Sequence, residues 1–354
     1  MGKKVFKTIS QQIEILKERG LIIEDEEKAR QYLLTNNYYN IINGYGKFFQ
    51  QKDDSDIYIN GANFNEVCDL YFYDKEIKML ILNTILTAEH HLKSILAYRF
   101  AEEYTNKRYA YLYADSYSED KVLDITYTIS KISRLINSKI NIQNKTKQKI
   151  KQKIKNSYDK DTKIGINSIY YYSKKYDDIP IWVISDYLNF GDIYYIIKSL
   201  PLKIENSIAH DLWSFIDDNV SKNSNYSGLL CNTKFAPETM ISFIKNLQEV
   251  RNVCAHNNRL LGFKCIQNSK KFTPLFKPFD DKYPEIKGKQ NSVFAAFITL
   301  QCFVSSQEFA ILNNSIRKRT RSLSKKLKSI KIEKIMELLG FPSDWYNLPK
   351  LKQH

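Results

Sequence analysis

Several patterns that mark whole classes of protein are absent from this sequence of 354 residues. Its five cysteines are scattered, odd in number and never arranged as a Cys-x-x-Cys pair. A disulfide framework uses an even set of cysteines and a thiolate zinc site uses closely spaced pairs, so neither is expected. The cysteine pattern suits a reducing compartment, and we expect the protein to be cytoplasmic.

Long apolar runs are also missing. The longest apolar-rich segment, residues 293–304, is interrupted by Thr299 and Gln301. It is shorter than the roughly 20 residues that a helix needs to cross a bilayer. No apolar run follows the lysines of the N-terminal Met-Gly-Lys-Lys-Val-Phe stretch, so we expect neither a signal peptide nor a spanning segment.

The sequence has no glycine-rich phosphate loop, no Gly-x-Ser-x-Gly turn and no internal repeat. It also has no group of Asp, Glu, His or Cys at metal-ligand spacing. A nuclease that uses a divalent cation needs several carboxylates that converge on the ion. We therefore expect neither a metal nor a cofactor.

Apolar residues and positive charge are abundant. The chain is 43% hydrophobic and 13% aromatic, enough for one large domain or two smaller ones. Its formal net charge of +15 favours an anionic partner, nucleic acid first and an acidic membrane surface second. Codon bias is a competing explanation of the charge, because Lys, Asn, Ile and Tyr are all frequent and Lys far outnumbers Arg.

Apolar residues recur at helical spacing, and period-two alternation is nearly absent, so the sequence predicts an all-α protein. The segment 63–103 is expected to form one long helix or two in series. Further helices are expected over 9–19, 25–34, 180–191, 192–200, 238–258 and 292–315. We expect three regions: an N-terminal helical and aromatic lobe at 1–62, a helical core at 63–260 with a basic insertion near 121–175, and a C-terminal helical lobe at 261–354.

The segment 238–258 carries the most informative residues. At about 100° per residue, Arg251 falls on the apolar stripe of this helix, whereas Asn252 and His256 share a face beside it. An arginine on a core-facing stripe is costly unless it meets an acid, a partner subunit or a phosphate. The alternative is an arginine whose stem lies along apolar surface and an ordinary histidine.

Two stretches of the chain, residues 145–155 and 317–331, are strongly basic. Either stretch is a solvated helix face or a surface that tracks phosphates and supplies affinity without sequence reading. Together with Arg259, the candidate phosphate contacts are Lys145, Lys147, Lys149, Lys151, Lys153 and Lys155 in the first stretch, and Arg317, Lys318, Arg319, Arg321, Lys325 and Lys326 in the second.

The sequence resembles a known family. Arg251-Asn-x-x-x-His256, followed by Asn-Asn-Arg259-Leu, is similar to the R-x4-6-H signature of HEPN ribonucleases and to the RNxCAHxxRL block of the Abi (abortive infection) family. The Abi proteins in question are the AbiD/AbiF-like members, which act in bacterial phage defence. Four further segments are similar to blocks of the same family, in the same order along the chain. They are Asn-Tyr-Tyr-Asn-Ile-Ile-Asn-Gly-Tyr45, residues 64–93, residues 177–191 and Gly-Phe-Pro-Ser-Asp-Trp345.

The resemblance implies a HEPN-like helical core and a metal-independent endoribonuclease toxin. By analogy with AbiF-like members, it also implies control by a small non-coding RNA. His256 would exchange protons with RNA, Arg251 would stabilise the scissile phosphate, and Asn252 would orient the histidine or donate to the phosphate. Glu89, on the neighbouring long helix, would position Arg251; the alternative is a solvated ion pair with Lys93, four residues further along the same helix. Since such sites are commonly built from two motifs and this chain has one, the resemblance implies a homodimer, or docking beside a guide-like RNA. We expect RNA as the partner and no membrane.

Two other classes stay open. The protein could be a non-catalytic RNA-binding module, because a fold does not fix a function. It could also be a sensor that recognises a phage protein. A steep salt dependence of RNA binding would separate the ribonuclease and the RNA-binding module from the sensor of a phage protein.

Overall fold

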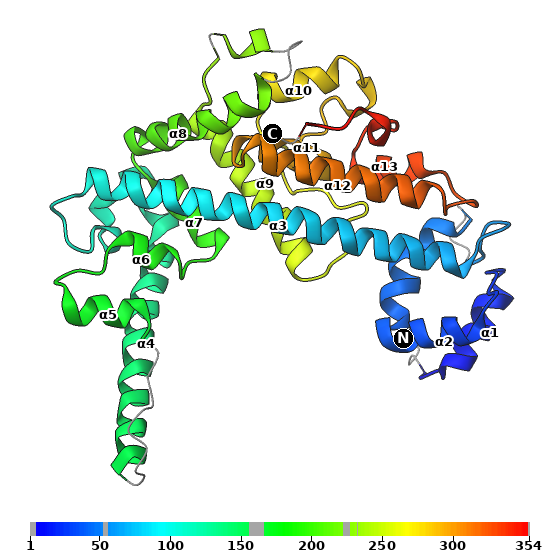
Figure 1. Cartoon of the computed structure of the whole chain (residues 1–354), viewed down its shortest axis with the longest axis horizontal. Helices are drawn as coiled ribbons and strands as arrows, with labels where there is room; N and C mark the ends of the chain where they lie inside the picture. Colours follow the sequence, from blue (N-terminus) through cyan, green and yellow to red (C-terminus); the bar gives the residue numbers. More distant parts are fainter. Residues whose placement is uncertain (1–4, 52–55, 156–165, 222–226, 232, 353–354) are drawn as a thin grey trace.

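The computed structural model describes residues 5–51, 56–155, 166–221, 227–231 and 233–352. These residues form helices and no β-sheet, with three isolated bridging residue pairs (Figure 1). The prediction of an all-α protein is confirmed. Within the same residues, no helix combines the length and the apolar content needed to cross a membrane.

The central element is α3, Phe64–Glu103, a single uninterrupted helix of 40 residues. At 1.5 Å per residue it is about 60 Å long. The side chain of Asn63 caps its first turn by accepting a hydrogen bond from the Asn65 amide. Most faces of α3 are covered, and its exposed residues fall on one narrow stripe that includes Met79, Leu86 and Tyr98. The sequence left open one helix or two, and the structure has one.

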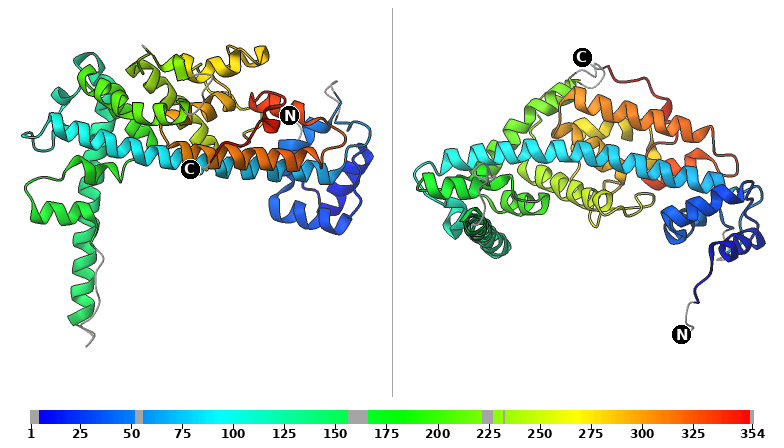
Figure 2. Two further views of the ribbon diagram at one scale, coloured as in Figure 1. Left: turned by 45° about the horizontal axis from the view of Figure 1, so that its top comes forward. Right: turned by 60° about the horizontal axis from the view of Figure 1, so that its bottom comes forward.

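The other helices are arranged along α3 (Figures 1 and 2). The N-terminal pair lies at its start, α12 runs alongside its first half, and α6, α8 and α9 also pack against it. The bounds are α1 Ile9–Glu18, α2 Glu26–Asn36, α4 Val122–Lys155, α5 Ser168–Lys175, α6 Ile181–Ser185, α7 Phe190–Ser199, α8 Leu202–Val220, α9 Pro237–Ala255, α10 Thr273–Asp280, α11 Val293–Thr299, α12 Ser306–Ser324 and α13 Ile332–Leu339.

Two predicted helices are divided in the structure. The helix expected over 292–315 is broken after α11, and Ser305 starts α12 with a capping box in which its hydroxyl and the Glu308 side chain each bond the other residue's amide. The helix expected over 180–191 ends at Ser185, and Gly191 lies in the first turn of α7, which Asn189 caps. Both errors came from following the apolar pattern across a polar cap.

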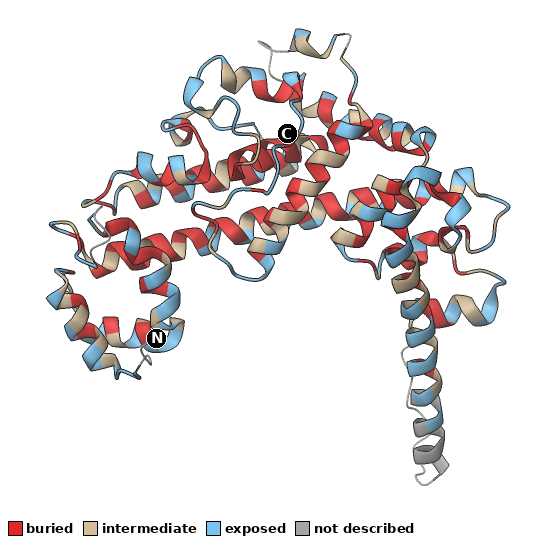
Figure 3. Cartoon of the chain, turned by 180° about the vertical axis from the view of Figure 1, so that it is seen from behind, coloured by how far each residue is buried: buried red, intermediate tan, exposed pale blue. Residues whose placement is uncertain are grey.

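Burial follows this arrangement (Figure 3). One apolar core runs through the molecule and joins residues from Ile13 in α1 to Trp345 near the C-terminus. By contrast, α4, which packs against α5 and α7, projects from the body at its far end, and its described side chains become mainly exposed or half-buried in that direction.

Candidate functional site

Helix α9 ends in a well-formed C-terminal turn at the predicted site. His256 is the cap residue, and Asn257 follows with a left-handed φ of 54°. The Asn258 amide donates to the Val253 carbonyl at 3.0 Å and the Asn257 amide to the Cys254 carbonyl at 3.2 Å. These two bonds are those of a Schellman motif, in which asparagine tolerates the left-handed position better than most residues.

A buried ion pair on α3 holds this turn. Lys78 and Asp74 lie one helical turn apart, are 3% and 1% exposed, and approach to 3.3 Å. The Lys78 ammonium donates to the Asn257 side-chain oxygen at 2.9 Å and to the Asn258 carbonyl at 3.1 Å. A cation at this point also complements the negative end of the α9 dipole.

Asp74 is bonded on its other sides as well. Its carboxylate accepts hydrogen bonds from the Leu261 amide at 3.0 Å, the Leu260 amide at 3.3 Å and the Tyr45 hydroxyl at 2.6 Å. Burial, followed by the negative charge of Asp74, raises the pKa of Tyr45 well above its usual range, so the phenol stays protonated and donates. The network therefore joins the N-terminal aromatic segment, α3 and the end of α9.

Arg259 belongs to the same assembly. Its Nη1 donates to the Gly44 carbonyl at 2.6 Å, its Nε donates to the Leu261 carbonyl at 3.0 Å, and its guanidinium lies 5.2 Å from the Phe48 ring centroid. We predicted Arg259 as a phosphate contact, and in the structure its donors bond carbonyls of the chain itself.

The predicted catalytic residues lie at the C-terminal end of α9, with Arg251 and Asn252 in the helix and His256 as its cap. Arg251 is half-buried, and its Nε is buried without a hydrogen-bond partner among the described residues. Its Nη1 makes a long contact of 3.5 Å with the Asn252 side-chain oxygen. Asn252 and His256 are exposed and lie four residues apart at the end of α9.

Glu89 does not complete that group. Its carboxylate pairs with Lys93, one turn along α3, at 2.9 Å. Within the described part of the chain no ion pair joins Glu89 to Arg251. Its second oxygen, Oε2, is buried without a hydrogen-bond partner there, as is Oε1 of Gln248, which precedes Arg251 by one turn of α9.

Tyr45, Asp74 and Lys78 were not predicted as site residues from the sequence. A signal was present, because an Asp and a Lys four residues apart fall among apolar residues of one predicted helix. Charges in such positions are rarely buried unless they are paired.

The two basic stretches differ. Lys145 is exposed on α4, and the side chains of Lys147, Lys149, Lys151, Lys153 and Lys155 lie outside the described residues. In the second stretch Arg319 pairs with Glu76 at 3.2 Å and Lys326 with Asp69 at 2.6 Å, both acids on α3. Lys318 and Lys325 are exposed, and Arg321 donates to the Tyr346 carbonyl at 2.8 Å.

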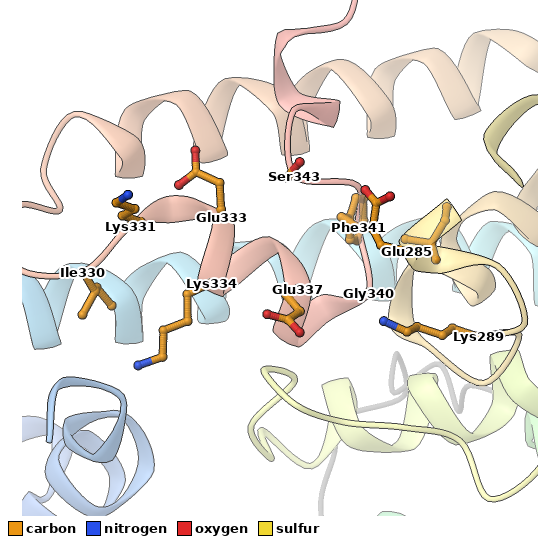
Figure 4. A pocket seen from close by; sticks show the side chains of 11 residues that line it. Glu285, Lys289, Ile330, Lys331, Glu333, Lys334, Glu337, Gly340, Phe341 and Ser343 are labelled. Carbon is orange, nitrogen blue, oxygen red and sulfur yellow. The ribbon is translucent and has the colours of Figure 1, made fainter. Parts of the chain in front are cut away.

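A pocket of about 640 Å³ lies beside α13 (Figure 4). Acidic and basic side chains are mixed around it, including Lys331, Glu333, Lys334 and Glu337. None of the predicted catalytic residues lines it. Among the described residues, no group of three or more His, Cys, Asp or Glu is placed to hold a metal ion.

Fold and site together define an all-helical protein in which a buried charge network fixes the end of α9. The chain belongs to the Abi-like protein family, which it matches over residues 31–262. The match includes the whole network and the candidate catalytic residues, and it stops before α12. Membership associates the chain with abortive infection, a defence against phage. No curated protein and no solved structure matches the chain.

Proposed function

We propose that the protein acts in abortive infection as a metal-independent endoribonuclease, with Arg251, Asn252 and His256 as its catalytic residues. The observation that carries the proposal is the contrast at the end of α9. Asn257, Asn258 and the backbone after them are fixed by a buried network, whereas Asn252 and His256 beside it are exposed and Arg251 is half-buried with an unbonded Nε. Catalytic groups are held in this way by a rigid support beneath them.

The chemistry needs only these groups and RNA. His256, acting as a base, removes the proton from a ribose 2′-hydroxyl, and the oxygen attacks the adjacent phosphorus. The bond from phosphorus to the 5′-oxygen breaks, and that oxygen takes up a proton. Arg251 stabilises the negative charge that grows on the phosphate. The products are a 2′,3′-cyclic phosphate and a 5′-hydroxyl.

With one imidazole per site, no second group is assigned to donate a proton to the departing 5′-oxygen. We propose that a second copy of the chain brings its own motif to the same RNA across a two-fold seam. The exposed position of Asn252 and His256 is compatible with such a seam. Lys145 on α4 and the lysines that follow it would add phosphate contacts that any RNA sequence can use. A non-coding RNA bound there without being cut would act as an inhibitor.

The test is cleavage of RNA by the purified full chain in the presence of a chelator. His256→Ala should lower the rate by about 10²–10⁴-fold, as expected for loss of a general acid–base group, with thermal stability unchanged. His210→Ala is the matched control, because that histidine is exposed on α8, and it should cleave at the wild-type rate. A substrate with a 2′-deoxy sugar at the cut site should resist.

Two results would overturn the ribonuclease proposal. One is cleavage that requires magnesium, and the other is a His256→Ala protein that cleaves RNA as fast as the wild type. RNA binding that persists without cleavage by any variant would favour the non-catalytic RNA-binding module.

A further inference from the structure

A groove of about 670 Å³ lies between α12 and the segment that follows η9, Trp345–Asn347. Its volume falls within the range of small-molecule sites. The described residues that line it include no acid, only cations and neutral residues. The cations that line it are Arg317, Lys318, Arg321, Lys325 and Lys350.

Only some of the basic residues in and just after α12 line the groove. Positions 317, 321 and 325 follow one another at intervals of four, and position 318 lies three residues before 321, so the four share one face of the helix. Arg319 and Lys326 lie off this face and are neutralised by Glu76 and Asp69 of α3. The tertiary structure therefore gathers one set of cations around the groove and pairs the other set elsewhere.

Arg317 is the unusual member of the groove. It is 2% exposed, and both Nε and Nη1 are buried without a hydrogen-bond partner among the described residues. Its third nitrogen, Nη2, makes only a long bond of 3.4 Å to the Tyr346 carbonyl. A buried guanidinium without a counter-charge is strongly unfavourable. Burial, and then the positive charge of Arg321, lower the pKa of Arg317, which shows how poorly the charge is compensated.

The walls of the groove are tied together. The Asn314 side chain on α12 donates to the Leu351 carbonyl at 2.8 Å and accepts from the Leu351 amide at 3.0 Å. Arg321 donates to the Tyr346 carbonyl at 2.8 Å. The C-terminal segment is thus fixed against α12 at two points, and the groove is formed before any ligand arrives.

We propose that this groove binds a terminal phosphate ester, carried by a free nucleotide or by the end of an RNA chain, with Arg317 as its buried anchor. A phosphate monoester carries a charge of about −1.5 to −2 near neutral pH and has three strong acceptor oxygens. Its oxygens can accept from the unbonded donors of Arg317, Nε or Nη1, each of which forms a forked pair with the weakly bonded Nη2. A phosphate within a chain continues on both sides, which hinders it from reaching a side chain so deeply buried.

The site uses none of the residues at the end of α9. Its RNA-end form rests on the proposed function insofar as that function supplies RNA as the ligand, whereas its nucleotide form does not. His256→Ala should leave binding to the groove unchanged, so the two proposals can fail separately.

The experiment measures binding of short 2′-O-methyl RNA probes, which resist cleavage, to the full chain by fluorescence anisotropy. Probes of one sequence carry a 5′-phosphate, a 3′-phosphate or only hydroxyl ends, and AMP is added as a competitor. At least one phosphorylated probe should bind about tenfold or more tightly than the hydroxyl probe, as for one charge-assisted hydrogen bond. AMP that competes at equal concentration identifies a nucleotide site, and AMP that competes only weakly identifies an RNA end. Equal binding of all probes would overturn the proposal.

Matched variants locate the site. Arg317→Met should remove the preference for the phosphorylated probe, whereas Arg319→Met, on the same helix with the same change of charge, should keep it within about twofold. Lys350→Gln lies on the exposed C-terminal segment and should weaken the preference severalfold even if Arg317→Met does not fold. Equal losses in Arg317→Met and Arg319→Met would mean that surface charge alone is responsible. A Lys350→Gln protein with unchanged preference would mean that the phosphate does not bind in this groove, and either result would overturn the proposal.

Discussion

At the scale of residues, the structure separates groups that look alike in the sequence. Asp74 with Lys78 and Asp281 with Lys277 are both acid–lysine pairs four residues apart on a helix. The first pair is almost inaccessible to water and holds the end of α9, whereas the side chains of the second are about half exposed. Their contributions to stability should differ accordingly, because breaking a buried pair leaves a charge without compensation.

Asp74→Ala should therefore lower the free energy of unfolding by about 3–5 kcal/mol, since Lys78 and the amides of Leu260 and Leu261 lose their partner. Asp281→Ala should change it by less than about 1 kcal/mol. Urea unfolding of the two variants gives both values. Equal effects would mean that the buried network does not stabilise the fold.

At the scale of elements, the end of α13 supports the end of α9. The Gly262 amide, just past the site, donates to the Leu338 carbonyl in the last turn of α13 at 3.1 Å. That turn closes with Gly340, whose φ of 75° is left-handed. A Cβ built on Gly340 would lie 2.4 Å from the Cβ of Ser292, which caps α11, so only glycine fits between the two helices.

Gly340→Ala should consequently destabilise the protein by about 2–5 kcal/mol, from the left-handed backbone and the overlap with Ser292. Gly44→Ala is the matched control. Gly44 has helical backbone angles, and no atom lies within 4 Å of its added Cβ, so the change should be neutral or slightly stabilising. Thermal melting of both variants checks this, and a Gly340→Ala protein as stable as the wild type would contradict it.

At the scale of the whole molecule, one core extends across the chain and encloses cysteines far apart in the sequence. Burial raises the pKa of the thiols of Cys68, Cys254 and Cys265 to about 12, and Cys231 is exposed. In the unfolded chain these thiols ionise near their ordinary pKa of 9.0, while the folded chain keeps their protons. The unfolded state is therefore favoured increasingly as the pH rises from about 9 toward 12.

The urea midpoint should thus be independent of these thiols below pH 8 and should fall between pH 9 and pH 11. Cys265→Ala should make that fall shallower, because one raised pKa is removed. Cys231→Ser should leave it unchanged, since that thiol is exposed in the folded chain as well. A midpoint that stays constant up to pH 11 would contradict the burial of these thiols.

The sequence by itself determined the all-α class, the helical nature of 63–103 and the position of α9, because helical periodicity and a proline start are local properties. It also identified the Abi-like family and singled out Arg251, Asn252 and His256 as candidates. The division of 292–315 was missed for a local reason, since the capping box at Ser305 decided it against the apolar pattern.

Only the tertiary structure decided which charged side chains are paired or hydrogen-bonded within the chain. Asp74 and Lys78 are 180 or more residues from several of their partners at the end of α9, and Arg259 bonds a carbonyl 215 residues away. Arg317 and Arg319 are neighbours in one basic run, yet one is buried at a groove and the other is paired with Glu76. The physical reason is that a charge is paired or left without a partner by what packs against it, and residues distant in sequence supply those contacts.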